Sequence, residues 1–380
     1  MTHTNKGVFF VEIKARWYHE QMKPRPCIPI FFGVQWRGFF MKIISVESLT
    51  KLLHRHGFEA FLQDLMNALR RDFGRFETFT QMPRPAMHVP GGVLELMPIC
   101  DNELYYTFKY VNCHPKNPLS GKQTVVATGQ LSEIATGYPL MFCEMTILTA
   151  LRTAATAALA TDLLAAKNAH TVAIIGNGAQ SEFQIKGLQL VRTIKEVRYF
   201  DTDPKAMDKF EKNMKGTKLK RTRCKNVEEA VDRADIITVC TACKAQVDVL
   251  QNKWVKPGVH INALGGDTVG KTELESSILS RCRIVVEYFE QSFVEGEIQR
   301  FTQAEAKKRV YAQLHELVTG RKIGRHTKQE ITLFDSVGIA LEDYSALRLV
   351  YELAEKYRIG EERNFTPVLE NPKNLFGAIL

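Results

Sequence analysis

The spacing of apolar residues predicts helices and strands in mixed order up to about residue 169. Helical periodicity marks residues 47–55 and 58–75, and strand-like runs follow at 93–99, 104–112 and 123–131. After these runs, the alanine-rich stretch 146–166 predicts a long helix. Its small side chains permit close packing against another helix or against a partner chain.

From His170 onward the pattern changes to short, β-branched apolar runs that alternate with helical ones. The runs expected to form strands are "TVAII", "EVRYF", "ADIITVC", "GVHINALG", "RIVVE" and "EITLFDS". Strands separated by helices predict a parallel sheet with right-handed crossovers. A last helix, from about Gly338 to Tyr357, is long enough to cross back onto the first part of the chain.

These patterns predict an α/β protein with three segments. Residues 170–337 are expected to form a Rossmann-type doubly wound parallel sheet that binds a dinucleotide. Residues 41–169 together with 338–380 are expected to form a second, α+β domain for substrate binding and dimerisation. Residues 1–40 show no helical period, so we expect a poorly ordered or non-native N-terminal extension.

Composition argues against a membrane or nucleic-acid partner. The chain is 45% hydrophobic and 24% charged, and it has no run of about 18 uninterrupted apolar residues. The net charge is +9, but part of the excess lies in the first 40 residues and the rest is spread along the chain. We therefore expect no nucleic-acid binding.

The eight cysteines are scattered, which predicts reduced thiols in a cytoplasmic location. Cys240 and Cys243 form a C-x-x-C pair with no second pair or neighbouring histidines, so we interpret them as free thiols. No metal site is expected.

A glycine motif after the strand at 171–175 indicates a dinucleotide site. Gly176 and Gly178 open a helix in the pattern G-x-G-x-x-S, which allows a tight turn and a close approach of the backbone to a pyrophosphate. Asp201 ends the next strand, where an acid accepts hydrogen bonds from the ribose hydroxyls. The carboxylate favours NAD over NADP, although Arg198 and Lys205 lie nearby in sequence.

The stretch "NALGGDTVGKTEL" places Asp267 directly after two glycines at the end of an expected strand. Ligands of doubly wound sheets bind at this edge, so we expect Asp267 to face the cofactor and to move protons. A helix is expected from Thr272, with Glu273 in its first turn. The alternative is a plain turn, because glycine and aspartate are common turn residues.

Three cations in the first part of the chain are candidates for binding a substrate carboxylate. Arg84, Lys109 and Arg152 lie near the ends of expected strands or helices, and Lys109 sits in the apolar run "LYYTFKYV". Each alone also fits a structural or surface role.

The chain resembles the ornithine cyclodeaminase/mu-crystallin family from about residue 41 to about residue 375. The motifs that carry the resemblance are "FKYVNCHP", "LTALRTAAT", "IGNGAQSEFQ", "NALGGDTVGKTEL", "VEGEIQ" and "TLFDSVGIALEDY". The resemblance implies a homodimer that binds NAD. It also implies that Asp267 is the general acid/base, a residue not generally kept where family members act as ketimine reductases or crystallins.

The resemblance further assigns binding roles to individual residues. For the substrate it implies Arg84, Glu95, Lys109, Arg152 and Val337. For the cofactor it implies Thr124, Arg152, Gly176, Gly178, Ala179, Gln180, Asp201, Thr241, Leu264, Gly265, Gly266, Asp267, Lys271 and Ser336.

The reaction implied is a closed redox cycle that converts L-ornithine to L-proline and ammonia without net use of NAD. This would place the protein in proline biosynthesis and in ornithine or arginine catabolism. Two alternatives stay open: an NAD(P)-dependent amino-acid dehydrogenase or ketimine reductase, and a non-catalytic NAD(P)H-binding protein. Lysine or a shorter diamino acid also stays open as the substrate.

Overall fold

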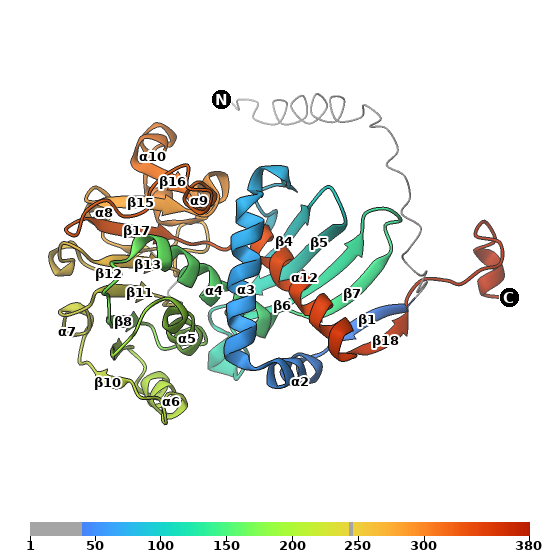
Figure 1. Cartoon of the computed structure of the whole chain (residues 1–380), viewed down its shortest axis with the longest axis horizontal. Coiled ribbons are helices and arrows are strands. Elements are labelled where there is room, and N and C mark those ends of the chain that lie inside the picture. The colour runs from blue at the N-terminus through green and yellow to red at the C-terminus, as the bar shows by residue number, and fades with distance from the viewer. Residues whose placement is uncertain (1–39, 243–245) are drawn as a thin grey trace. The chain divides into compact units, whose positions relative to one another are not determined.

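The computed structural model describes residues 40–242 and 246–380. The predicted N-terminal extension therefore lies outside the described residues, apart from Phe40. Figure 1 shows two sheets with helices packed around them. One sheet takes its strands from 40–144 and 361–364, and the other takes its strands from 171–335. The domain boundaries at 169/170 and 337/338 remain a prediction.

The first sheet has eight strands in the order β18-β1-β7-β6-β5-β4-β2, with β3 also paired to β4. Its strands are β1 (Phe40–Ile44), β2 (Thr80–Gln81), β3 (Ala86–Val89), β4 (Gly92–Cys100), β5 (Tyr105–Cys113), β6 (Val125–Glu133), β7 (Pro139–Glu144) and β18 (Glu361–Asn364). All neighbours are antiparallel except β1 and β7. The predicted strands at 93–99, 104–112 and 123–131 correspond to β4, β5 and β6.

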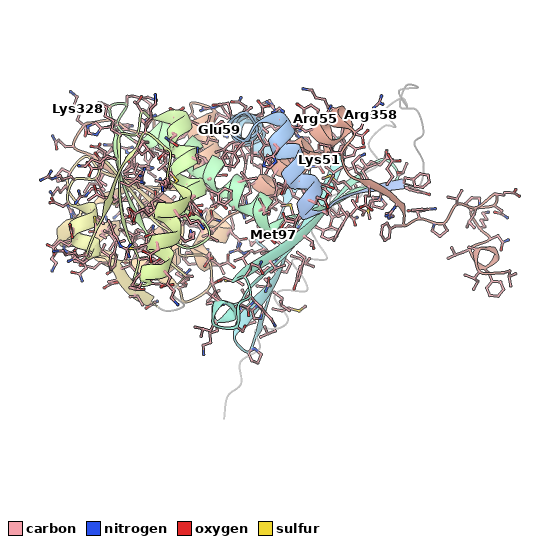
Figure 2. The ribbon with its side chains drawn as sticks, turned by 90° about the horizontal axis from the view of Figure 1, so that it is seen from below. Lys51, Arg55, Glu59, Met97, Lys328 and Arg358 are labelled. Carbon is pink, nitrogen blue, oxygen red and sulfur yellow. The ribbon has the colours of Figure 1, made fainter. Side chains whose placement is uncertain are left out.

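One face of this sheet is covered by helices, which lie on the same side of the strands in Figure 2. α12 (Ala340–Tyr357) lies against β4, β5 and β6, α3 (Phe58–Gly74) packs on α12, and α2 (Val46–His56) contacts both helices and β1. α3 buries Phe61, Leu65 and Leu69 in the largest apolar core, and α12 adds Leu347 and Val350. The last helix thus crosses back onto the first sheet, as its length predicts.

The alanine-rich helix is α4 (Thr146–Leu164), and it is buried within the chain. It lies against α3, against α12 and against α5 (Ser181–Val191). A Cβ at Gly187 of α5 would lie 2.6 Å from the carbonyl oxygen of Ala154, so small residues bring these two helices close. α4 is long and apolar enough to cross a membrane by composition, but 78% of it is buried in the fold, which is typical of a core helix.

The second sheet has eight parallel strands in the order β10-β9-β8-β11-β13-β17-β15-β16. The strands are β8 (Thr171–Ile175), β9 (Glu196–Phe200), β10 (Lys220–Arg223), β11 (Ile236–Val239), β13 (His260–Ala263), β15 (Cys282–Val286), β16 (Val310–Gln313) and β17 (Ile331–Asp335). The order changes direction at β8, with β9 on one side and β11 on the other, which confirms the predicted doubly wound α/β fold.

Shorter elements complete the described chain. The helices are α6 (Pro204–Asn213), α7 (Val227–Val231), α8 (Ser276–Leu279), α9 (Phe289–Glu295), α10 (Gln303–Arg309) and α11 (Leu314–Val318). Single 3₁₀ turns are η1 (Phe76–Thr78), η2 (Asn117–Ser120), η3 (Asn252–Trp254), η4 (Glu297–Arg300) and η5 (Phe376–Ala378).

The predicted helix from Thr272 is wrong, because Thr272–Leu274 is a strand. This strand, β14, pairs in parallel with β12 (Gln246–Leu250) in a small separate sheet. A partner more than 20 residues away in sequence supplies the hydrogen bonds, so local sequence gave no sign of it. Glu273 is consequently buried at 1% exposure, instead of facing solvent in a first helical turn.

Candidate active site

The register of the second sheet places five chain turns at one edge. Ile175 of β8 pairs with Phe200 of β9 and with Val239 of β11, and Ala263 of β13 pairs with Val239 and with Asp335 of β17. The strands therefore end at the same level. The residues that follow them, Gly176, Asp201, Cys240, Leu264 and Ser336, meet at one opening.

This opening is a cavity of about 950 Å³ between the second sheet and the first. Nearly every residue predicted for the site lines it: Arg84, Glu95, Lys109, Thr124, Arg152, Gly176, Gly178, Ala179, Gln180, Asp201, Thr241, Leu264, Asp267, Lys271, Ser336 and Val337. Gly265 and Gly266 were predicted as well and are not among the lining residues.

The glycine turn between β8 and α5 leaves room for a ligand. Gly176 has φ of 92°, and a Cβ there would lie 2.8 Å from the carbonyl oxygen of Cys240, so only glycine fits. At Gly178 a Cβ would meet nothing within 4 Å, which leaves open space in front of the N-terminus of α5. Open backbone at a helix N-terminus suits a pyrophosphate.

Asp201 follows β9 and turns its carboxylate back toward the glycine turn. It accepts the backbone N–H of Asn177 at 2.6 Å and that of Asp203 at 2.8 Å. The guanidinium of Arg198 points elsewhere, because it is buried against the carbonyl groups of Ala230 and Glu229.

Neither Arg198 nor Lys205 is among the described residues that line this cavity. The carboxylate of Asp201 therefore has no cation from these two candidates beside it, which favours NAD over a 2′-phosphorylated dinucleotide.

Asp267 lies in the loop after β13, with its side chain 34% exposed to the cavity. Its Oδ1 lies 3.1 Å from Nζ of Lys271, which also donates to the carbonyl of Thr241 at 3.2 Å. Burial acts against the charge of Lys271, but the carboxylates of Asp267 and Glu273 outweigh it and raise its pKa. Asp267 is thus a half-buried carboxylate held by a permanent cation.

The two glycines before Asp267 make room for buried side chains, and their predicted contact with the cofactor stays a prediction. A Cβ at Gly265 would lie 1.6 Å from Oε2 of Glu273, and one at Gly266 would lie 3.2 Å from Oε1 of Glu297. The glycines therefore admit two buried carboxyl groups behind the loop, and the close approach is to the protein itself.

Arg84 joins the first sheet to the Asp267 loop. Its Nη2 donates to the backbone carbonyl of Asp267 at 2.8 Å and lies 2.5 Å from Oε2 of Glu295, while its Nε lies 3.1 Å from Oε1 of Glu95. Burial disfavours its charge, but Glu295 and Glu95 outweigh that effect and raise its pKa. Most of the guanidinium is thus already engaged, which weakens its predicted role as a free carboxylate ligand.

Lys109 and Arg152 converge on one oxygen atom. Nζ of Lys109 lies 2.9 Å from Oδ1 of Asp343, and Nε of Arg152 lies 3.1 Å from the same atom. Burial, followed by the charge of Arg152, lowers the pKa of Lys109 to about 8. Two cations that share one carboxylate oxygen form a binding site for a carboxylate, here called the carboxylate locus.

Strand periodicity explains why Glu95 and Lys109 both face inward. They occupy alternate, buried positions of β4 and β5, so their side chains leave the same face of the sheet. Burial raises the pKa of Glu95, and the cation of Arg84 opposes that rise.

A second buried acid pair supports the floor of the cavity. Arg152 Nη1 lies 2.5 Å from Oε2 of Glu342, at the start of α12. Glu287, just after β15, accepts the hydroxyl of Ser336 at 2.5 Å and the backbone N–H groups of Val337 and Gly338 at 3.0 and 2.7 Å. The turn between β17 and α12 is therefore fixed by side chains, and Val337 is held at the cavity wall.

Sequence reasoning missed the acids that pair with the predicted cations, Glu295, Glu342 and Asp343. It also missed Glu287, which accepts hydrogen bonds from Ser336 and from the backbone of Val337 and Gly338. Each of these acids lies inside an apolar stretch, such as "VVEYF" or "GIALEDY". An acid in a buried segment requires a partner, and this signal could have identified them as a group. The particular partners could not be assigned, because they lie far away in sequence.

The C-x-x-C pair cannot be described as a pair, because Cys243 lies outside the described residues. Cys240 lines the cavity, and burial raises its pKa. The described parts of the chain contain no group of three or more His, Cys, Asp or Glu residues that could hold a metal ion.

Known proteins share this arrangement. The sequence profile described as "Ornithine cyclodeaminase/mu-crystallin family" matches residues 46–357. An ornithine cyclodeaminase of Brucella abortus biovar 1 (strain 9-941) is 48% identical over 337 residues, which cover 89% of this chain and 92% of the relative.

Two solved structures extend the comparison. A lysine cyclodeaminase, studied for its recognition of L-lysine, L-ornithine and L-2,4-diaminobutyric acid, has a TM-score of 0.81 at 27% identity and covers 89% of this chain and 99% of its own. An archaeal alanine dehydrogenase dimer with bound NAD has a TM-score of 0.79 at 33% identity and covers 86% of this chain and 100% of its own.

Proposed function

Because the chain belongs to the ornithine cyclodeaminase/mu-crystallin family, we propose that it is an NAD-dependent ornithine cyclodeaminase that forms L-proline and ammonia. One observation carries the proposal. Asp267, paired with Lys271, lies in the same cavity as a glycine turn and a two-cation carboxylate locus. In this proposal, a proton-transfer group would share one cavity with a dinucleotide site and an amino-acid site.

The residues present fit NAD. Open backbone at Gly178 and the N-terminus of α5 suit the pyrophosphate, and the carboxylate of Asp201 suits the ribose hydroxyls. Thr124, Thr241, Leu264 and Ser336 line the remaining wall of the same cavity. When bound, NAD⁺ supplies a reversible hydride acceptor, so that no other redox partner is needed.

Lys109 and Arg152 would hold the α-carboxylate of ornithine. Their nitrogen atoms already converge on Oδ1 of Asp343, so a substrate carboxylate would occupy a place that favours negative charge. Lys109 must be protonated for this role, and its pKa of about 8, lowered by burial, leaves it mostly charged at neutral pH.

Asp267 would move the protons that ring closure requires. The δ-ammonium of ornithine has an ordinary pKa of about 10.4 and must lose a proton before its nitrogen can attack the α-carbon. Asp267 is exposed enough to reach a substrate, and Lys271 holds its carboxylate in place. Glu95, on the inward face of β4, would supply a counter-charge for the δ-ammonium. Arg84 would then act mainly as a link that fixes the backbone of Asp267.

The test is incubation of the purified protein with L-ornithine and a catalytic amount of NAD⁺, with proline and ammonia measured together. We expect equal amounts of both, many turnovers per NAD⁺ and no lasting NADH absorbance. NADH that accumulates in step with ammonia would instead identify an amino-acid dehydrogenase.

Two further outcomes separate the remaining alternatives. Activity with L-lysine or diaminobutyrate, but none with ornithine, would keep the reaction and change the substrate, because one methylene is worth only about 1–3 kcal/mol in an apolar pocket. NADH binding without turnover of any diamino acid would indicate a non-catalytic binding protein.

The protein is further proposed to be a homodimer. Outward-facing Leu96, Tyr106, Tyr110 and Val126 of β4–β6 are 38–46% exposed. They alternate with the buried residues of these strands that pack with α12, so they lie on the opposite face of the sheet. A solved relative with 33% identity is a dimer. A monomeric mass in sedimentation equilibrium would contradict this assignment. α4 gives it no support, because its small residues pack inside the chain.

A cytoplasmic location is proposed from the cysteines. Five cysteines in the described part of the chain are free thiols, which suits a reducing compartment: Cys100, Cys143, Cys224, Cys240 and Cys282. Intermolecular or intramolecular disulfides in protein isolated without reductant would argue against it.

A further inference from the structure

Lys271 lies between two carboxylates, and only one of them belongs to the proposed mechanism. Its Nζ is 3.1 Å from Oδ1 of Asp267 and 3.9 Å from Oε1 of Glu273. Lys271 comes directly before β14 and Glu273 lies within it, and their side chains, two positions apart, reach the same side of the chain. The intervening Thr272 instead accepts a hydrogen bond from Nε of Arg300 at 2.7 Å.

The protein provides a dedicated space for the Glu273 carboxyl group. The side chain is 1% exposed, and its Oε1 accepts the hydroxyl of Thr241, a residue of the cavity wall. Its Oε2 has no hydrogen-bond partner among the described residues and occupies the place where a Cβ of residue 265 would be.

The strand that carries Glu273 is anchored independently of this carboxyl group. Glu297 accepts the backbone N–H groups of Glu273 and Leu274 at 2.7 and 3.2 Å, and Asp335 in turn accepts those of Glu297 and Ile298. The backbone is therefore held without the Glu273 side chain. An unsatisfied buried carboxyl oxygen is costly, so a purely structural role explains the residue poorly.

We propose that Glu273 is a positioning residue that, through Lys271, controls how strongly Asp267 holds a proton during turnover. The inference rests on the proposed function, because it assigns the proton transfer to Asp267. Glu273 does not itself line the cavity, so it acts through Lys271 and Thr241, which do.

The effect has a definite direction with pH. Burial raises the pKa of Glu273 to about 7, and Lys271 limits the rise. Below pH 7 Glu273 is neutral, and the charge of Lys271 acts on Asp267 alone. Above pH 7 Glu273 is ionised, and its negative charge offsets part of the positive charge of Lys271. Lys271 then stabilises the ionised form of Asp267 less, so Asp267 accepts a proton more readily. Catalysis should therefore rise through an inflection near pH 7.

Other titratable groups lie around Lys271 and Glu273. Their effects on the pH profile must be distinguished from the effect of Glu273. Glu297 lies on the η4 side, with a pKa raised by burial to about 8, and Cys240 lies after β11. On the cavity side, Cys113 interacts electrostatically with Lys271, and Asp267 interacts electrostatically with Arg84. None of these groups lies between Lys271 and Asp267, so a substitution confined to Glu273 isolates its contribution.

The test compares Glu273→Gln with wild type and with Glu275→Gln over a range of pH. Glutamine keeps the shape of Glu273 and can accept the Thr241 hydroxyl, but it cannot ionise. We expect kcat/KM for ornithine to match wild type near pH 6 and to fall to about one tenth of it at pH 9. Glu275, whose oxygens bind Asn252 and Ser277 outside the cavity, should give a wild-type profile.

A constant ratio of Glu273→Gln to wild type at every pH would overturn the proposal. A second variant keeps the test decisive if Glu273→Gln does not fold. Thr241→Val removes the donor that lowers the pKa of Glu273, so the inflection should move to higher pH, whereas Thr241→Ser should leave it in place. An unmoved inflection in the valine variant would equally refute the coupling.

The coupling can also be measured without turnover. Infrared difference spectra between low and high pH report the protonated carboxyl of Glu273, identified by its loss in Glu273→Gln. Asp267→Asn should lower the pKa of Glu273, because the charge of Asp267 raises it. An unchanged titration would refute the coupling, while inactivity of wild type towards ornithine would refute only the proposed function.

Discussion

The two halves of the cavity are built by different means. On the cofactor side, the site is formed mainly by the backbone. Gly176 allows the tight turn, Gly178 leaves space in front of the helix, and Asp201 accepts a hydrogen bond from a backbone N–H of the turn. On the side proposed for the substrate, the cavity wall is formed by buried charged side chains. Lys109 and Arg152 meet Asp343, and Arg84 meets Glu95 and Glu295.

The difference shows in the sequence distances involved. The cofactor side joins residues 24 positions apart, from Asn177 to Asp201. The substrate side joins residues 234 apart, from Lys109 to Asp343, and 190 apart, from Arg152 to Glu342. A local turn can form a dinucleotide site, whereas the proposed amino-acid site requires α12 to be packed onto the first sheet.

The largest expected effect is at Asp267, where the two halves meet. Asp267→Asn should keep NAD binding and lose about 10²–10⁴-fold in kcat, because a single acid/base group typically contributes that much. Steady-state rates and NADH fluorescence titration measure the two properties. Asp232→Asn, which alters an exposed ion pair with Lys256, serves as the control, and turnover near normal in Asp267→Asn would remove Asp267 from the mechanism.

Arg152→Ala tests whether the stability of the fold and the binding of ornithine depend on the buried ion pairs of Arg152. It leaves Glu342 and Asp343 buried with less compensation, so we expect a loss of about 3–5 kcal/mol in the free energy of unfolding. The ornithine KM should rise as well.

Urea unfolding and kinetics measure the two effects of Arg152→Ala. Arg70→Ala, which breaks a half-exposed pair with Asp162, should change stability by about 1 kcal/mol or less. An unchanged KM in Arg152→Ala would place Arg152 outside the substrate site.

Lys109→Arg tests the pH dependence of the same side. Burial lowers the pKa of Lys109 from 10.5 to about 8, so the folded protein loses this cation as the pH rises through 8. The ornithine KM of wild type should therefore increase above pH 8. Arginine stays charged, so in the variant the ornithine KM should increase less above pH 8 than in wild type. Any increase caused by titration of ornithine itself should be the same in both proteins. Parallel KM profiles would show that Lys109 does not hold the substrate.

The smallest effect is expected on the cofactor side, where the backbone dominates. Asp201→Asn keeps an acceptor for Asn177 but removes the charge, so NAD should bind about tenfold more weakly and discrimination against NADP should narrow. Isothermal titration with both dinucleotides measures this. Asp203→Asn, a helix cap outside the cavity, should leave both affinities unchanged.

The same contrast explains what could be predicted from sequence. The alternation of strands and helices, the glycine turn and the position of Asp267 after a strand all depend on local patterns, and each appears where it was expected. The strand at Thr272 was missed because its hydrogen bonds come from β12. The need for a glycine at position 265 was not foreseen, because the group that requires it, Glu273, was expected on a helix.

The shared oxygen of Asp343 has a consequence for how ligands compete. The site carries its own tethered carboxylate at the place proposed for the carboxylate of the amino acid, so binding there would be an exchange of one anion for another. A tethered group acts at a high effective concentration. Simple carboxylic acids would therefore be poor inhibitors, and only a ligand with further contacts along the cavity would displace the Asp343 carboxylate.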